Sequence, residues 1–495
     1  MNVVKRIAKN SSVTMGTGIV NMVGALLTLA VVARYLDAER FGEYIFVMAF
    51  IAVFEVLTDM GYNAILVREI ARAKDQLTKV VGTAVIVKFF VALLSFGLIL
   101  ISATVFELAV ELSPEVKNAI CVMALVVTLD FFVDICISTI RAHEKMEYEA
   151  IIVVFNRVTT VLFIGLVAMF NLGFLSLFLA RLYSNILTSG LAIFVYVRRF
   201  GKLQLDYDIS TSRHLTKEAL PLGVGQLVDR LYITTNFFLI RIIQSAAEVG
   251  FYGGAYRIIQ KCGIVAVSIV AAVFPVFSKL SQSSVSSLAL AHEKTLKFLV
   301  AISLPVVVIV ICMSKKITTI LFGTNVLEIA QSLKILAFCL VLNFSNLLFK
   351  FTLNAMNKQL LYRRNILVAF VTNLVLALLL IPVYGHIGAC VAFLASSGLL
   401  FVLGHWSISK YMAGVSLKAA LVRPFASALV MAVFLVLGRD INFYLVVPGS
   451  ILAYVVSSAV LGTFTIDEIR MLQSARTGPR DHNEEDVRYA PCSLS

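Results

Sequence analysis

The sequence predicts an all-α polytopic membrane protein with about fourteen transmembrane helices. Hydrophobic residues make up 60% of the 495 residues and charged residues only 14%, whereas soluble domains carry roughly 25% charged residues. The mean hydropathy of +0.93 indicates more apolar surface than a water-soluble core can bury, so the excess must face lipid. The apolar runs are continuous rather than alternating, which favours helices over barrel strands, because backbone polar groups in lipid must be satisfied internally.

A helix needs about 20 predominantly apolar residues to cross a bilayer, and runs of this length form two groups of six followed by a pair. The first group lies at residues 11–34, 41–60, 80–106, 116–141, 150–170 and 173–197. After a charged stretch, the second group lies at residues 218–241, 249–278, 294–313, 329–354, 361–384 and 385–409. The final pair lies at residues 416–437 and 442–464.

These groups of spans divide the chain into five parts. We expect an N-terminal six-helix lobe at 1–200, a cytoplasmic inter-lobe linker at 201–217, a C-terminal six-helix lobe at 218–410, two additional transmembrane helices at 411–464 and a disordered cytoplasmic tail at 465–495. Similar segments six spans apart, such as those that start at Asn171 and Tyr384, indicate that the lobes are repeats in the same orientation. Chance similarity between apolar segments is the alternative explanation.

The distribution of positive charge predicts the orientation of the chain. When the N-terminus is placed in the cytoplasm, the predicted cytoplasmic segments hold several times as many Lys and Arg residues as the predicted external loops, as the positive-inside rule requires. Orientation therefore accounts for the net charge of +13 without a nucleic-acid partner. We expect a multi-pass protein of the cell membrane with both termini in the cytoplasm.

The sequence carries no pattern typical of an enzyme, a metal site or a bound cofactor. The seven cysteines show no paired metal-ligand spacing. No Gly-x-x-x-x-Gly-Lys-Ser/Thr phosphate loop is present, and the longest predicted loops, of about twenty residues, are too short for a catalytic domain. We therefore expect neither catalysis by this chain nor a cofactor.

Ionisable side chains inside the predicted spans are the candidate functional residues. Each costs at least about 2.5 kcal/mol inside a membrane, so each needs a charged partner, a wet cavity or an interface within reach. The cations that we expect to line a substrate cavity are Arg257, Arg157, Arg181, Arg230, Lys261 and Lys88. The acidic candidates for ion coupling or charge pairing are Asp130, Asp134, Asp229 and Glu55. By contrast, Lys334, Lys350 and Asp59 are expected to reach an interface.

Depth and helical spacing indicate which of these charges belong together. Lys88, Asp134 and Arg157 lie at similar depths in three consecutive spans and could meet at one level. Arg257 and Lys261 are four residues apart and so share one helix face. A surplus of cations suits an anion, and the guanidinium group matches phosphate oxygens in a bidentate manner. The alternative is that the charges form static pairs between helices.

Several segments resemble the polysaccharide biosynthesis, or O-antigen repeat-unit, flippases, up to about Arg470. The segments are Leu57-Thr58-Asp59-Met60-Gly61 with Arg68-Glu69, Gly253-Gly254-Ala255-Tyr256-Arg257, Ile381-Pro382-Val383-Tyr384-Gly385-His386-Ile387-Gly388-Ala389 and Thr465-Ile466-Asp467-Glu468. This family shares a superfamily with multidrug and toxin (MATE) extruders and lipid II flippases. The resemblance implies two six-helix lobes around a central cavity, two peripheral helices and alternating access. It also implies that Arg257 stands where family members carry a second-lobe arginine.

The resemblance further implies a flippase that moves a polyprenyl-pyrophosphate-linked oligosaccharide across the membrane. Membrane lipid and the glycosyltransferases or polymerase of the same pathway would be its partners. One alternative is a cation-coupled multidrug exporter that uses Asp130 and Asp134, although a surplus of cations disfavours cationic drugs. Another is a non-transporting membrane scaffold for glycan assembly, in which the charges inside the spans would be purely structural.

Overall fold

The computed structural model describes residues 3–72, 77–202, 204–323, 326–412, 417–438 and 443–463, and the secondary-structure elements found there are all α-helices. The predicted tail at 465–495 lies outside the described residues. The helices are α1 (Val3–Tyr35), α2 (Ala38–Asp59), α3 (Tyr62–Arg72), α4 (Leu77–Ala109), α5 (Pro114–Ala142), α6 (Met146–Met169), α7 (Phe174–Phe200), α8 (Ile209–Ile243), α9 (Ala246–Cys262), α10 (Ile264–Ser283), α11 (Val285–Phe322), α12 (Val326–Ala355), α13 (Gln359–Ser409), α14 (Leu417–Leu437) and α15 (Phe443–Val460).

Length and composition confirm a multi-pass membrane protein, although they do not reach the predicted count of fourteen spans. Among the described residues, ten helical stretches are long and apolar enough to cross a membrane. The apolar parts of α14 and α15 are shorter. The 51-residue α13 covers two predicted spans because its backbone folds back at Gly385, where φ is +53°. Asn365 Nδ2 accordingly donates hydrogen bonds to Leu403 O at 3.1 Å and to Ser407 Oγ at 2.8 Å, across the two antiparallel halves.

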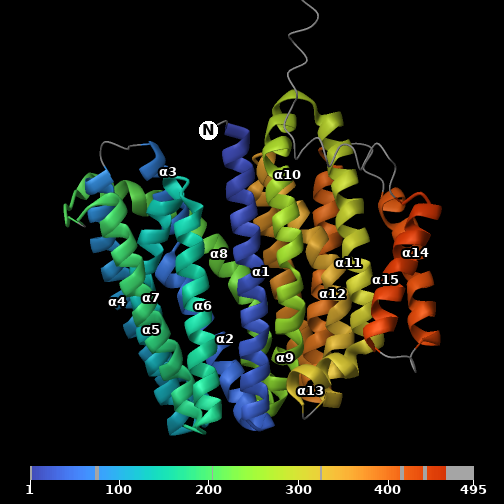
Figure 1. Ribbon diagram of the computed structural model, residues 1–495, viewed down its shortest axis with the longest axis horizontal. Helices are drawn as coiled ribbons and strands as arrows, with labels where there is room; N and C mark the ends of the chain where they lie inside the picture. The colour runs from blue at the N-terminus through green and yellow to red at the C-terminus, as the bar shows by residue number, and fades with distance from the viewer. Residues whose placement is uncertain are drawn as a thin grey trace, which may run out of the picture.

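The helices form two lobes, as the sequence predicts. Figure 1 shows α4 to α7 on one side of the molecule, α10 to α13 on the other, α1 between them, and α14 and α15 at the far edge. The same pattern of neighbours recurs in each lobe, because α5 packs against both α4 and α7 while α12 packs against both α11 and α13. The added pair joins the second lobe through α11, on which α14 packs.

In each lobe the second span is a broken helix. The first lobe has α2 and α3 separated by Met60 and Gly61, whose φ angles of +43° and +80° lie in the left-handed region. The second lobe has α9 and α10 separated at Gly263. The predicted span at 41–60 ends at the first break, although no helix was predicted for residues 62–72, and the predicted span at 249–278 runs across Gly263.

The segment between the lobes is held against the first lobe. Asp208 N donates to Thr83 Oγ1 on α4 at 3.1 Å, and the Asp208 carboxylate lies 3.3 Å from Lys79 Nζ. The same carboxylate caps α8, and hydrogen bonds from Ser210 and Thr211 hold its pKa well below the usual range. Because the cap stands at Asp208, α8 begins at Ile209, earlier than the predicted span at 218.

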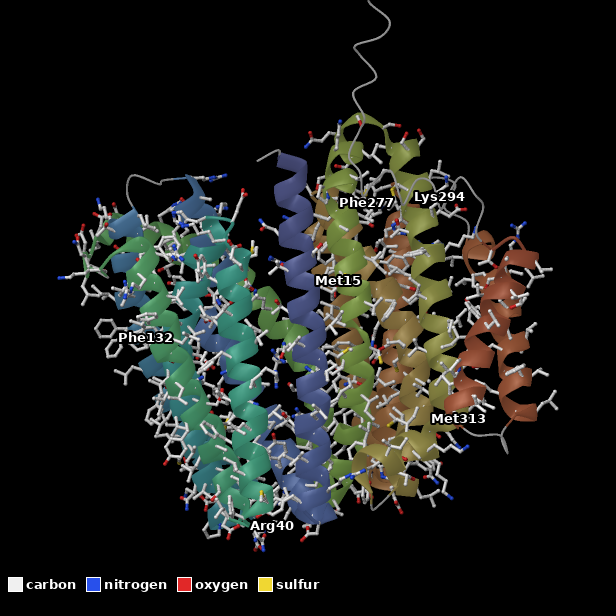
Figure 2. The ribbon with its side chains drawn as sticks, in the orientation of Figure 1. Met15, Arg40, Phe132, Phe277, Lys294 and Met313 are labelled. Carbon is white, nitrogen blue, oxygen red and sulfur yellow. The ribbon has the colours of Figure 1, made fainter. Side chains whose placement is uncertain are left out.

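The two lobes meet closely where α2 packs against α9. A Cβ atom at Gly42 would overlap the carbonyl of Ala246, and one at Gly253 would overlap the side chain of Ile45. A further inter-lobe bond joins Ala247 N to Glu39 Oε2 at 3.2 Å. Figure 2 places Arg40 at this end and Lys294 at the opposite end. In the predicted orientation, the closed end is the outer one.

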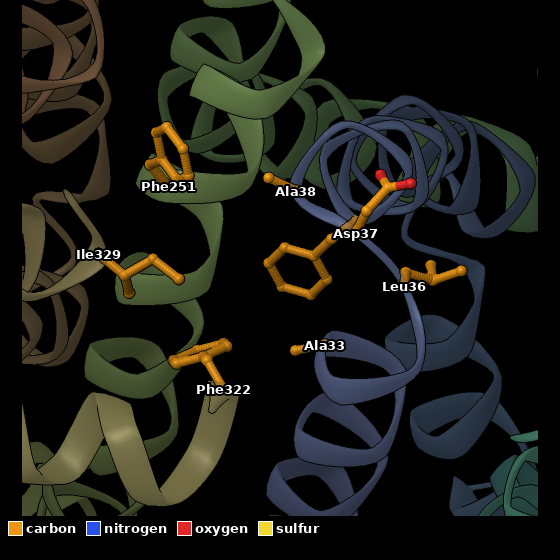
Figure 3. A pocket seen from close by; sticks show the side chains of 8 residues that line it. Ala33, Leu36, Asp37, Ala38, Phe251, Phe322 and Ile329 are labelled. Atoms are coloured by element: carbon orange, nitrogen blue, oxygen red, sulfur yellow. The ribbon is translucent and has the colours of Figure 1, made fainter. Parts of the chain in front are cut away.

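A small pocket marks this junction between the lobes. Figure 3 shows Ala38, at the start of α2, across from Phe251 of α9 and Phe322 of α11, while the carboxylate of the neighbouring Asp37 points away from these rings. The remaining lining is apolar and comes from Ala33, Leu36, Phe41 and Ile329. With one carboxylate and no cation among these eight residues, the pocket offers nothing that would bind an anion.

The close approach at Gly42 yields a first prediction. Gly42→Ala should lower the stability of the purified protein by about 1–3 kcal/mol, because the added methyl group has to push α2 and α9 apart. Gly97→Ala on α4 is the matched control, since a Cβ there meets nothing within 4 Å. The unfolding temperature in detergent measures both variants. Equal unfolding temperatures would show that the α2–α9 contact is not tight.

Candidate functional site

Four cations from both lobes form one cluster, which we call the cation cluster: Arg157 on α6, Arg181 on α7, and Arg257 and Lys261 on α9. Arg181 repels each of the other three, and Lys261 is repelled by all three arginines. All four side chains are half-buried. The structure therefore brings together four of the six predicted cavity cations.

The cation cluster has no acidic partners at contact distance. In the described part of the chain, no carboxylate oxygen lies within 4.0 Å of these four side chains. Arg157 Nε donates to the neutral Asn21 Oδ1 at 2.7 Å, and Arg257 Nε is buried without a hydrogen-bond partner. A static ion-pair network, the alternative left open by the sequence, would have paired these groups. The cluster instead keeps its positive charge available to an anion.

Arg230 on α8 also has no carboxylate within 4.0 Å among the described residues. It lies within electrostatic range of Tyr256 on α9 and is half-buried. No interaction with the cation cluster is found for it. We therefore keep Arg230 as a separate candidate rather than a member of that cluster.

Acidic groups of the first lobe lie beside the cation cluster. Asp130 accepts a hydrogen bond from Asn185 Nδ2 at 2.5 Å, and it interacts electrostatically with Asp134, Glu55 and Arg181. Glu55 also attracts Arg257 at longer range. Asp130 and Glu55 thus moderate the field of the cations without forming salt bridges to them.

Lys88 does not belong to the cation cluster. Its side chain is completely buried, and Nζ lies 2.9 Å from Asp134 Oδ2, 2.7 Å from Asn63 Oδ1 and 3.8 Å from Asp59 Oδ1. Lys88 and Asp134 therefore meet, as their depths predict, whereas Arg157 bonds to α1 instead. Asp59, for which an interface position was expected, interacts with Lys88 beside the break between α2 and α3, and its position relative to the interface stays a prediction.

Asp229 forms a second ion pair in the other lobe. Its Oδ2 lies 2.6 Å from Lys350 Nζ on α12, and this nitrogen also lies 5.2 Å from the centre of the Tyr362 ring. Lys350 was expected to reach the membrane interface. An interhelical carboxylate satisfies its charge, and the interface position stays a prediction.

Sequence reasoning missed the neutral amides that accompany these charges. Asn21, Asn63 and Asn185 bond to Arg157, Lys88 and Asp130 respectively. The sequence does contain a signal for these contacts, because an asparagine in an apolar span needs a hydrogen-bond partner on another helix. Among the described residues, no group of three His, Cys, Asp or Glu side chains could hold a metal ion.

Two lobes with broken helices that pack closely where α2 meets α9, and that carry unpaired cations between them, define a multi-pass membrane protein of the two-lobed transporter class. The chain belongs to the polysaccharide biosynthesis protein family, whose model matches residues 7–281. The "Putative O-antigen transporter" of Shigella flexneri is 25% identical over 313 residues, which are 61% of this chain and 73% of that protein. The "Probable low-salt glycan biosynthesis flippase Agl15" of Haloferax volcanii is 23% identical over 406 residues, 80% and 82% of the two chains.

Solved structures share the fold. The lipid II flippase MurJ in an inward closed conformation matches with a TM-score of 0.73 at 16% identity, over 94% of this chain and 99% of that chain. An inward-facing multidrug resistance MATE transporter of the MOP superfamily has a TM-score of 0.68 at 15% identity, over 82% and 100%. An outward-facing MATE transporter reaches 0.57 at 16% identity, over 83% and 97%.

The buried Lys88 pair yields a second prediction. Lys88→Met should destabilise the protein by on the order of 2 kcal/mol, because it leaves the Asp134 and Asp59 carboxylates uncompensated although they keep partial exposure. Adding Asp134→Asn should restore at least half of the loss. Lys117→Met, which breaks the exposed Lys117–Glu107 pair, should change stability by less than about 0.5 kcal/mol. Thermal unfolding in detergent measures all three, and a double variant less stable than Lys88→Met would contradict the assignment.

Proposed function

We propose that this protein is a flippase for lipid-linked oligosaccharides. The cation cluster is the observation that carries the proposal, because both lobes contribute unpaired positive groups to one place. A pyrophosphate headgroup supplies the negative charge that these groups lack. Guanidinium groups bind phosphate oxygens through paired N–H donors, so Arg157, Arg181 and Arg257 would hold the headgroup and Lys261 would add charge.

The transport mechanism that we infer is alternating access. The structure is closed at the Arg40 end by the contact of α2 with α9, while the cation cluster takes residues from both lobes. A headgroup that binds to both lobes is released when the lobes separate at the closed end and meet at the other. Two such states, each open to one side, are the minimum that net movement requires.

The relatives support the same substrate class. The Haloferax volcanii relative is named a glycan biosynthesis flippase and the Shigella flexneri relative an O-antigen transporter. Applied to this chain, these names favour a glycan on a lipid carrier as cargo. The lipid tail would stay in the bilayer while the charged headgroup and the sugars pass between the lobes.

The remaining features of the proposal follow from this function. We place the protein in the cell membrane with both termini in the cytoplasm, so that glycan assembled inside reaches the outer leaflet. Glycosyltransferases or a polymerase of the same pathway would act before and after it. The chain itself transports the glycan and catalyses no reaction.

A multidrug exporter is the alternative that the acidic group favours, since Asp130, Asp134 and Glu55 would attract a cationic drug. The nearby cations argue against an exporter of cationic drugs. Arg181 interacts with Asp130, and three further positive groups lie in the same cluster. A cationic drug would therefore meet more repulsion than attraction, whereas a pyrophosphate meets the reverse.

The third prediction tests the flippase function. In sealed vesicles that carry a labelled lipid-linked oligosaccharide, Arg257→Ala should lower the rate of translocation by about tenfold to a hundredfold, because one charge-assisted phosphate contact is lost. Arg257→Lys, which keeps the charge but not the paired donors, should retain an intermediate rate.

Arg423→Ala serves as the control, because Arg423 lies on the peripheral α14 and donates to Gly462 O rather than joining the cation cluster. It should translocate at the wild-type rate. A wild-type protein that does not move the lipid-linked sugar would refute the flippase proposal. If the same vesicles instead showed proton- or sodium-driven uptake of a cationic dye, the exporter reading would replace it.

A further inference from the structure

The side chain of Arg157 does not extend freely from α6. Its Nε donates a hydrogen bond of 2.7 Å to Asn21 Oδ1 on α1. Among the described residues, no other hydrogen bond or salt bridge of this guanidinium is found, and Arg157 is half-buried. The Nε atom is therefore fixed, while the N–H groups of the two terminal nitrogens remain available to donate hydrogen bonds.

A second contact fixes the stem of the same side chain. A Cβ atom at Gly24 would overlap Cγ and Cδ of Arg157, so the methylene groups lie directly against the backbone of α1. Gly24 follows Asn21 by three residues, which places both on the same side of the helix. Together they form a notch on α1 that holds the Arg157 stem at Gly24 and its Nε at Asn21.

The partner of Arg157 is neutral, and this decides what the notch can do. A carboxylate at position 21 would also orient the guanidinium, but it would form an ion pair and cancel most of the charge that an anion could use. An amide oxygen accepts the same hydrogen bond without contributing a negative charge. The notch therefore orients Arg157 and leaves its charge intact.

We propose that Asn21 and Gly24 are positioning residues that hold Arg157 with its two terminal nitrogens presented to a phosphate group of the lipid carrier. The inference rests on the flippase function proposed above and adds two residues of α1 to it. Neither residue contacts the phosphate: Asn21 and Gly24 act only through Arg157. An arginine held in advance loses less side-chain freedom on binding, which strengthens its interaction with phosphate.

The fourth prediction concerns binding of a probe without sugar. Purified full-length protein is titrated with a polyprenyl pyrophosphate, and the dissociation constant is measured. Asn21→Ala and Gly24→Ala should each raise it by about threefold to tenfold, because Arg157 loses its preferred orientation. Asn21→Asp should raise it at least as much as Asn21→Ala, because the new carboxylate neutralises Arg157. In an Arg157→Ala background, neither Asn21→Ala nor Gly24→Ala should change it further.

Thr17→Ala is the matched control on α1, since the Thr17 hydroxyl donates to Val13 O of its own helix, at 2.8 Å, and not to Arg157. It should bind as wild type does. The Gly24→Ala variant should still fold, because only the flexible Arg157 side chain has to move to admit the methyl group. The inference would be overturned if Asn21→Ala and Gly24→Ala bound with wild-type affinity, or if Asn21→Asp did. It would also be overturned if the α1 variants still weakened binding in the Arg157→Ala background.

The test separates this inference from the function on which it rests. If the wild-type protein itself does not bind the polyprenyl pyrophosphate, while it is folded and monodisperse, the flippase proposal fails first. If Arg157→Ala raises the dissociation constant above that of the wild-type protein but the α1 variants match the wild type, the notch alone is refuted.

Discussion

The structure depends on the balance of charge inside its helical lobes. An ionisable group inside a membrane requires a partner or access to water, and this chain satisfies the requirement in two ways. Lys88 and Lys350 each have a carboxylate on another helix within 3 Å. The cation cluster has none in the part of the chain that the structure describes, and its four side chains remain half-buried. The lysine–carboxylate pairs fix helices within a lobe, whereas the cation cluster is free to bind an anion between the lobes.

This division assigns different roles to different parts of each lobe. The Lys88 pair joins α4 and α5 beside the break between α2 and α3, and the Lys350 pair joins α12 to α8. Both pairs lie within a lobe and can stay intact while the lobes move as bodies. The cation cluster takes residues from α6, α7 and α9. Its geometry therefore changes when the lobes separate, which is the property that a carrier requires of its binding site.

The sequence predicted the helices well, because apolar length alone determines where a chain crosses lipid. It failed at Gly263, where the apolar run continues through the helix break, and at α3, whose arginines resemble those of a loop. Among the charges, depth predicted the meeting of Lys88 with Asp134. Depth does not give the rotation of a helix about its axis, so the sequence could not foresee that Asp229 faces Lys350 or that Arg157 faces Asn21.

The central claim is that the cation cluster keeps its charge and can be reached by water from one side only. Single cysteines at positions 181 and 257, in a protein whose native cysteines have been replaced, can be treated in oriented vesicles with membrane-impermeant thiol reagents of opposite charge. We expect labelling from the side opposite Arg40, and a faster reaction with the anionic reagent than with the cationic one. Absence of labelling from both sides, or faster reaction with the cationic reagent, would contradict it.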